Sequence, residues 1–236
     1  GRHASIAASD QFWEHWFCEQ WRTIAAVAEP WACAMVFCDY RTIAALERAV
    51  AASESGWSVS QCAIWDRGSI GLGSPMRARH EMIAFLRGPS FKWDGRKDIA
   101  NVFRCDWPYG SHPHHPSEKP VSLLKDLLGD FARGSRVLDP FCGSASSGVA
   151  ARELGVDWDG IEQDAETAKG AASRLGLRGR LMAPTVVRRA PGDSGVYLMN
   201  RQKRGWGEYA IHMRSEQDVE VFYDVTVGAW THDEHG

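Results

Sequence analysis

Residues 135–162 constrain the fold more tightly than any other stretch of the chain. They contain, in order, an apolar run at 137–138, a turn rich in Gly and Ser at 139–148, a helical run at 149–154, a second apolar run at 156–161 and Glu162. Strand, glycine-bearing turn, helix, strand and carboxylate in this order are typical of a nucleotide-binding βαβ unit.

The residue types of this segment also suit a ligand. Small residues let the backbone approach a bound molecule, and the first turn of the helix offers free N–H groups. A carboxylate at the end of the second strand, here Glu162, can accept both hydroxyls of a ribose. The turn lacks a G-x-G-x-x-G pattern, which argues against a dinucleotide site. An ordinary βα turn that binds nothing is the alternative.

Two motifs in this region carry a family resemblance. Asp139-Pro-Phe-Cys-Gly-Ser144, with an acidic residue after the next strand, resembles the cofactor loop of S-adenosylmethionine-dependent DNA amino-methyltransferases. That family commonly has Asp-Pro-Phe-x-Gly-Ser-Gly-Thr, so the chain departs from the pattern at Ala145-Ser146. Upstream, His115-Pro-Ser-Glu-Lys-Pro120 and an amphipathic run at 121–128 reproduce the order of the permuted, beta-type members.

The resemblance implies a fold and a cofactor. The expected fold is α/β, a three-layer Rossmann-like sandwich around a mostly parallel sheet, with the Val137 strand flanked by the strands at Val156 and Ala32. The expected cofactor is S-adenosylmethionine. Its expected binding residues are His115, Pro116, Ser117, Lys119, Pro120, Asp139, Pro140, Phe141, Cys142, Gly143, Ser144, Glu162 and Gln163.

The catalytic motif of this family is Asp/Asn/Ser-Pro-Pro followed by an aromatic residue, which binds the target amine and stacks on the extruded base. In the beta-type order it precedes the helix expected at 11–27, so it is expected upstream of Gly1, and the sheet edge near Ala32 is expected to be partly uncovered. Asp106-Trp-Pro-Tyr109 is a weak candidate within the chain. It has Asp106, Pro108 and Tyr109, but tryptophan replaces the first proline, which favours coincidence.

The implied activity is site-specific methylation of double-stranded DNA at the N6 amine of adenine, with the N4 amine of cytosine second. A non-catalytic relative that binds cofactor or DNA is the alternative. A third option, methylation of a small molecule or protein, fits the paired motifs less well. The whole chain has 27 basic and 30 acidic residues, so any DNA contact must come from a local patch.

A basic, glycine-rich segment supplies such a patch. Residues 67–104 contain eight Lys or Arg and three Asp or Glu, a net charge of +5. Arg67, Arg77 and Arg79 in its loop are therefore the expected contacts to the DNA backbone. A solvated flexible loop is the alternative.

The remaining sequence predicts the domain organisation. Residues 1–180 read as the methyltransferase domain, with a loop at 1–9, a helix capped by Asp10 and further elements at 32–38, 42–52, 62–65, 80–86 and 165–175. Residues 181–236 read as a β-rich appendage, with alternating runs at 196–199, 208–213 and 219–227. It could be a target-recognition element, an oligomer contact such as a homodimer interface, or the start of another domain.

Cysteine spacing and hydropathy bear on the setting of the protein. Six cysteines are scattered without CxxC spacing, which indicates reduced thiols rather than a disulfide framework or a zinc site. No apolar run approaches the roughly 20 residues that span a bilayer. A cytoplasmic protein without metal or membrane partner is expected.

Overall fold

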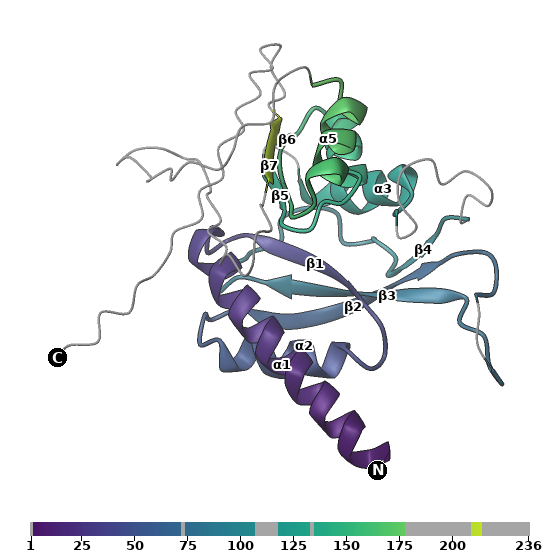
Figure 1. Cartoon of the computed structure of the whole chain (residues 1–236). Coiled ribbons are helices and arrows are strands. Elements are labelled where there is room, and N and C mark those ends of the chain that lie inside the picture. Colours follow the sequence, from purple (N-terminus) through teal and green to yellow (C-terminus); the bar gives the residue numbers. More distant parts are fainter. Residues whose placement is uncertain (1, 72–73, 107–117, 133–134, 178–208, 214–236) are drawn as a thin grey trace. The chain divides into compact units, whose positions relative to one another are not determined.

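The computed structural model describes residues 2–71, 74–106, 118–132, 135–177 and 209–213. They form two compact units, residues 1–107 and 108–236 (Figure 1), each of which is described by itself. Unit 1 contains α1 (Arg2–Val27), β1 (Cys33–Cys38), α2 (Ile43–Ala52), β2 (Ser58–Asp66), β3 (His80–Arg87) and β4 (Val102–Arg104). Unit 2 contains α3 (Val121–Phe131), β5 (Arg136–Asp139), α4 (Ser146–Leu154), β6 (Asp157–Glu162), α5 (Ala165–Arg174) and β7 (Tyr209–Met213).

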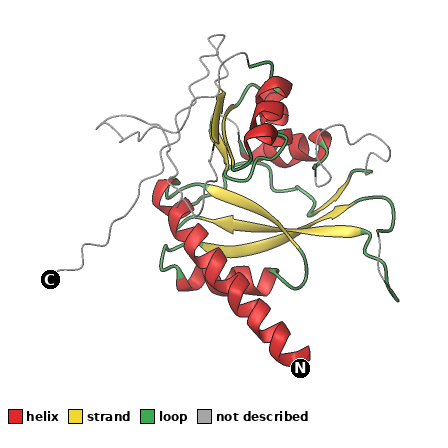
Figure 2. Ribbon diagram, viewed as in Figure 1, coloured by secondary structure: helices red, strands yellow, loops and turns green. Residues whose placement is uncertain are grey.

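Unit 1 is a four-stranded sheet with helices α1 and α2 packed on one face (Figure 2). The strand order is β1-β3-β2-β4; β3 is antiparallel to both neighbours, and β4 is parallel to β2. The core lies between helices and sheet and is built around Trp21, Leu46, Trp57 and Leu86. The rings of Trp21 and Trp57 meet edge to face at 5.3 Å, a favoured geometry for buried aromatic pairs.

Unit 2 is a three-stranded sheet, β5-β6-β7, accompanied by α3, α4 and α5. β5 and β6 are parallel, with Val137 opposite Trp158, and β7 runs antiparallel to β6. Trp158 is fully buried and lies in a cluster with Val149, Ala168 and Leu175. The carboxyl ends of β5 and β6 therefore lie at the same edge of this sheet, where open α/β sheets bind ligands.

Helices and strands of the core follow the sequence prediction closely, with three exceptions. α1 begins at Arg2, so residues 2–9 of the predicted loop are helical and Asp10 lies inside the helix instead of capping it. Ala4, Ala7 and Ala8 favour this longer helix, because alanine has the highest helix propensity. β2 is longer than predicted, and the short strand β4 was not predicted.

The predicted sheet order was wrong in part. β5 pairs with β6 as expected, but β5 is an edge strand of its described sheet, so the Ala32 strand does not flank it there. Nor is the pairing mostly parallel, since β1–β3, β2–β3 and β6–β7 are antiparallel. A continuous apolar run does not distinguish a parallel strand from an antiparallel one that is covered on both faces. β1 is an edge strand of its described sheet, and the uncovered edge expected near Ala32 stays a prediction.

Most of the predicted appendage, residues 181–236, lies outside the described residues. Its described part, β7, extends the β5-β6 sheet. The predicted strands at 196–199 and 219–227 also lie outside the described residues, and the boundary at residue 180 stays a prediction.

Candidate functional site

The loop between β5 and α4 lies against the end of β6. The N–H of Cys142 donates to the carbonyl of Ile161 at 2.9 Å, and the N–H of Ala145 closes a turn onto the carbonyl of Cys142 at 2.8 Å. Ala145 has a φ of +58°, a left-handed conformation that costs L-residues about 1–2 kcal/mol. Its side chain is fully buried, and this apolar burial offsets part of that cost. The departure from the family's glycine is thus accommodated by packing.

Glu162 is fixed beside this loop by two backbone donors. The N–H of Gly143 donates to Oε2 at 3.0 Å, and the N–H of Asp164 donates to Oε1 at 2.9 Å. Each carboxylate oxygen keeps a further lone pair, because an ionised carboxylate has about four acceptor positions. The carboxylate that the sequence singled out is therefore oriented at the sheet edge and able to accept hydrogen bonds from a ligand.

Asp139, at the end of β5, belongs to a partly buried network of hydrogen bonds with residues of the loop and of α4. Its Oδ1 accepts the N–H of Phe141 at 3.1 Å, and its Oδ2 accepts a short hydrogen bond from the hydroxyl of Ser147. The indole N–H of Trp158 donates to that hydroxyl at 3.1 Å. Burial raises the pKa of Asp139, while the Ser147 and Phe141 donors act in the opposite direction. Asp139 therefore holds the loop in place by accepting hydrogen bonds from Phe141 and Ser147.

Ser147 and Trp158 were not predicted as parts of the site. The sequence marked Ser147 only as a small turn residue and Trp158 only as part of an apolar run. Gly160 is the signal that could have revealed the tryptophan, because a Cβ at Gly160 would lie 2.1 Å from the Trp158 ring. Residues two apart on a strand face the same side of the sheet. A glycine at the second of these positions leaves room for the tryptophan ring to lie over the strand.

The remaining loop residues differ in exposure. Cys142 is buried, and burial strongly raises the pKa of its thiol, so it does not act as a thiolate nucleophile. Phe141 is 59% exposed and Gln163 is exposed. Both are therefore accessible to a molecule at this edge.

The motif at residues 115–120 contacts the loop between β5 and α4 through one described residue, Glu118. Glu118, Lys119 and Pro120 are described, whereas His115, Pro116 and Ser117 lie outside the described residues. Pro120 is buried and directly precedes α3. The hydroxyl of Ser146 donates to Oε1 of Glu118 at 3.3 Å, so the two motifs that the sequence paired do meet in unit 2.

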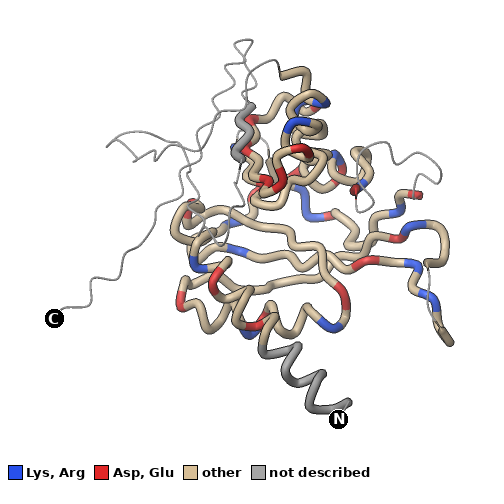
Figure 3. The backbone as a smooth tube through the Cα atoms, viewed as in Figure 1, with Lys and Arg blue, Asp and Glu red and all other residues tan. Residues whose placement is uncertain are grey.

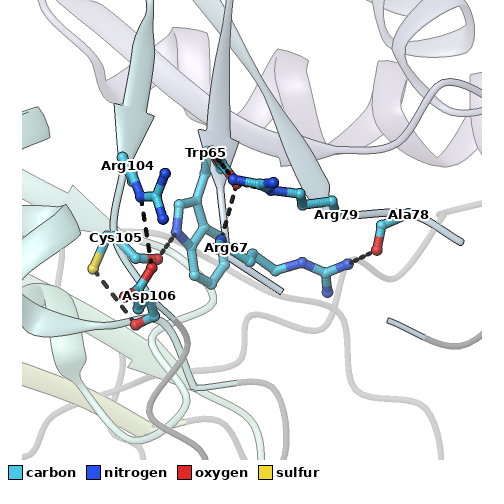
Figure 4. Close-up of polar contacts among 9 residues, drawn as sticks. Trp65, Arg67, Ala78, Arg79, Arg104, Cys105 and Asp106 are labelled. Atoms are coloured by element: carbon cyan, nitrogen blue, oxygen red, sulfur yellow. Dashed lines mark hydrogen bonds and ion pairs between the residues drawn. The ribbon is translucent and has the colours of Figure 1, made fainter. Parts of the chain in front are cut away.

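The predicted DNA-contacting arginines, Arg67, Arg77 and Arg79, lie in the β2–β3 connection of unit 1. Figure 3 marks the basic and acidic positions along the backbone, and Figure 4 shows Arg67 and Arg79 with their polar contacts. Arg79 donates to both oxygens of Asp66, at 2.7 and 2.8 Å. These bonds, with the N–H of Gly68, hold the pKa of Asp66 at about 2. Arg67 donates to the carbonyl of Ala78 at 2.7 Å, and its side chain is only 20% exposed. Both arginines hold the connection in shape.

Arg77 differs from the other two arginines. Its Nε donates to the carbonyl of Gly71 at 2.6 Å, and its side chain is exposed. This bond occupies one of five guanidinium donors. Arg77 is thus the arginine of this loop best placed to reach a phosphate.

Asp106, the described residue of the weak catalytic candidate, follows β4. Its side chain is 76% exposed and lies 3.8 Å from Nε of Arg104. It also lies over Gly68, where a Cβ would come within 2.0 Å of its Oδ1. Pro108 and Tyr109 lie outside the described residues.

Two other kinds of feature are absent from the described ranges. No described helix is long and apolar enough to cross a bilayer. Among the same residues, no group of three or more His, Cys, Asp or Glu is arranged to hold a metal ion.

Comparison with known proteins gives matches by sequence. A family model described as DNA methylase matches residues 5–173. The DNA adenine methyltransferase YhdJ of Escherichia coli (strain K12) is 29% identical over 115 residues, 47% of this chain and 39% of that protein. The type II methyltransferase M2.DpnII of Streptococcus pneumoniae is 42% identical over 62 residues, 26% of this chain and 23% of that protein. The matches thus span less than half the length of these curated relatives.

A solved structure gives a match by fold. The M1.HpyAVI–SAM complex superposes with a TM-score of 0.57 at 23% identity, covering 67% of this chain and 82% of that chain. This likeness confirms the α/β, Rossmann-like fold class expected from the sequence.

Proposed function

The chain belongs to the DNA methylase family whose model matches residues 5–173, and we propose that it transfers a methyl group from S-adenosylmethionine to the N6 amine of adenine in duplex DNA. The observation that carries the proposal is the carboxylate of Glu162, held beside the Asp139–Ser144 loop by two backbone donors. Adenine is preferred to cytosine because the relative YhdJ is described as a DNA adenine methyltransferase.

The residues at this edge fit the cofactor. Among the described residues, and apart from its two chain neighbours, no atom lies within 4 Å of a Cβ built on Gly143, which leaves room for a ligand beside the loop. Glu162 would accept the ribose hydroxyls, and the backbone of residues 139–144 would lie along the nucleoside. The segment 115–120 would face the methionine end, with Lys119 and Pro120 fixed at the start of α3. When bound, S-adenosylmethionine supplies an electrophilic methyl group.

The chain's own contribution to the chemistry is alignment. The target amine is a poor nucleophile because its lone pair is delocalised into the ring, so transfer depends on holding amine and methyl group in line. Asp139, Ser147 and Trp158 support the loop from the buried side. A group that accepts hydrogen bonds from the amine is also required, and the family provides it with an Asp-Pro-Pro-Tyr-type motif.

A second candidate function is cofactor binding without transfer. The observation that favours it is that no two prolines are adjacent anywhere in the 236 residues. Tritiated methyl transfer to mixed-sequence duplex DNA distinguishes the two functions, assayed on this chain and on a version extended at its N-terminus. Incorporation recovered as N6-methyladenine supports the proposal. Binding of S-adenosylhomocysteine without incorporation by either version supports the second candidate.

Asp106 is tested in the same assay. In whichever version transfers methyl groups, Asp106→Ala is expected to retain the rate within about twofold, because Asp106 is exposed, paired with Arg104 and followed by a single proline. A loss of 100-fold or more would make Asp106 the acceptor for the amine.

We also propose that the basic loop contacts the DNA backbone, chiefly through Arg77. Arg77→Ala is expected to weaken binding to every duplex and to reduce the slope of log K against log salt concentration by about 0.9, the value for one phosphate contact. Fluorescence anisotropy across a salt series measures this slope. Arg48→Ala removes the same charge from the exposed face of α2 and should leave the slope unchanged. Equal slopes for the parent and Arg77→Ala would contradict the contact.

A further inference from the structure

We infer that a mostly buried ion pair between Glu118 and Arg174 positions the cofactor loop, so that its integrity sets the affinity for the cofactor. This inference rests on the proposed cofactor site. Neither residue was singled out as functional by its position in the sequence. Both belong to unit 2, as does the loop, so the argument depends on contacts within one compact unit.

The ion pair joins two segments that are distant in the sequence. Arg174 is the last residue of α5, and Glu118 lies two residues before Pro120, which precedes α3. Nη2 of Arg174 is 2.5 Å from Oε1 of Glu118, and the two side chains are only 17% and 13% exposed. A charge pair this short and this well shielded from water has a defined geometry, unlike an exposed pair.

The second terminal nitrogen of Arg174 reaches the cofactor loop itself. Nη1 donates to the carbonyl and the hydroxyl of Ser144 and to the hydroxyl of Ser146, each at 3.1 Å. Ser146 in turn donates to Oε1 of Glu118 at 3.3 Å. One planar guanidinium thus holds the end of α5, the loop and the Glu118 segment together, as its fork of fixed donors permits.

The same helix also anchors the other side of the proposed site. α5 begins directly after Glu162 and Gln163, where Asp164 caps it by accepting the N–H of Thr167 at 2.8 Å. Asp164 also donates its own N–H to Glu162 at 2.9 Å. A single helix therefore fixes the ribose acceptor at its start and the Ser144 end of the loop at its end.

The electrostatics favour a positioning role over a purely stabilising one. Burying two charges costs much of what their attraction returns, so a buried pair adds little net stability compared with apolar packing. Among the described residues, Oε2 of Glu118 is buried and accepts no hydrogen bond, an arrangement that stability alone does not favour. The ion pair is therefore better explained by its orientation of the loop than by its contribution to the free energy of unfolding.

The test compares Glu118→Gln and Arg174→Gln with the parent chain, using titration calorimetry with S-adenosylhomocysteine. Each variant is expected to bind about tenfold more weakly, with melting temperatures recorded to correct for the folded fraction. Arg174→Lys keeps the positive charge but loses the planar guanidinium with its fixed donors. It should therefore bind more tightly than Arg174→Gln and more weakly than the parent. Ser146→Ala removes one bridging hydroxyl, leaves the ion pair in place and should weaken binding by about threefold, even if the Gln variants fail to fold.

A matched control is available in the same unit. Lys125 and Glu153 form an ion pair of 2.8 Å between α3 and α4, with side chains 40% and 45% exposed. Lys125→Gln and Glu153→Gln should bind S-adenosylhomocysteine like the parent. This pair also bridges two segments but makes no described contact with the loop.

The outcomes separate this inference from the proposed function. If the parent chain does not bind S-adenosylhomocysteine, the proposed cofactor site fails. If the parent binds but Glu118→Gln, Arg174→Gln and Ser146→Ala bind equally well in their folded fractions, the positioning role is overturned, even where the melting temperature falls. Weaker binding in these variants, partial recovery in Arg174→Lys and unchanged binding in the controls support the inference.

Discussion

Gly160→Ala is expected to destabilise the protein by about 3 kcal/mol, the upper part of the range for overpacking a buried site. A Cβ at this position would lie 2.1 Å and 2.4 Å from atoms of the Trp158 ring. The ring is fully buried, so it cannot move away without disturbing the core of unit 2. Urea unfolding followed by circular dichroism measures the change.

Gly170→Ala is the matched control for this substitution. Gly170 lies inside α5, and among the described residues no atom outside the helix's own backbone lies within 4 Å of a Cβ built there. Alanine is favoured over glycine in a helix interior by about 0.5–1 kcal/mol, so this variant should be more stable than the parent. In a double-mutant cycle, Gly160→Ala should cost less stability in a chain that also carries Trp158→Leu, because the ring that the new methyl group overlaps is gone. A stable Gly160→Ala variant would show that strand β6 does not fix the tryptophan as described.

Glu162→Ala should weaken binding of S-adenosylhomocysteine by about 1–3 kcal/mol, the range for losing charged hydrogen bonds, or roughly 5- to 150-fold. The substitution removes the expected acceptor for the ribose hydroxyls. It also removes the partner of the Gly143 and Asp164 N–H groups, so the loop loses its attachment to the end of β6. Titration calorimetry measures the affinity.

Glu166→Ala provides the comparison for Glu162→Ala. Glu166 lies in the first turn of α5, its side chain is 81% exposed, and it pairs only with Lys169 among the described residues. Removing this carboxylate should leave the affinity unchanged. Equal affinity in the parent and Glu162→Ala would remove Glu162 from the cofactor site.

The sequence by itself determined the local architecture of the site. β5, the loop, α4 and β6 follow one another within 27 residues, from Arg136 to Glu162, so short-range patterns were enough to predict them. The apolar runs set the strands, the small residues set the turn, and the carboxylate at the strand end marked Glu162. The two motifs were also correctly paired, because Ser146 and Glu118 are in contact.

Only the tertiary structure decided how distant segments meet. It placed β5 at the edge of its described sheet instead of between two strands, because strand partners depend on the whole arrangement of a sheet and not on the composition of one strand. It turned Arg67 and Arg79 toward Ala78 and Asp66, where fixed partners within the loop outcompete water. It also brought Arg174 to Glu118 and Ser144. The sequence lists these charges, but only the packing of α5 beside the loop makes them neighbours.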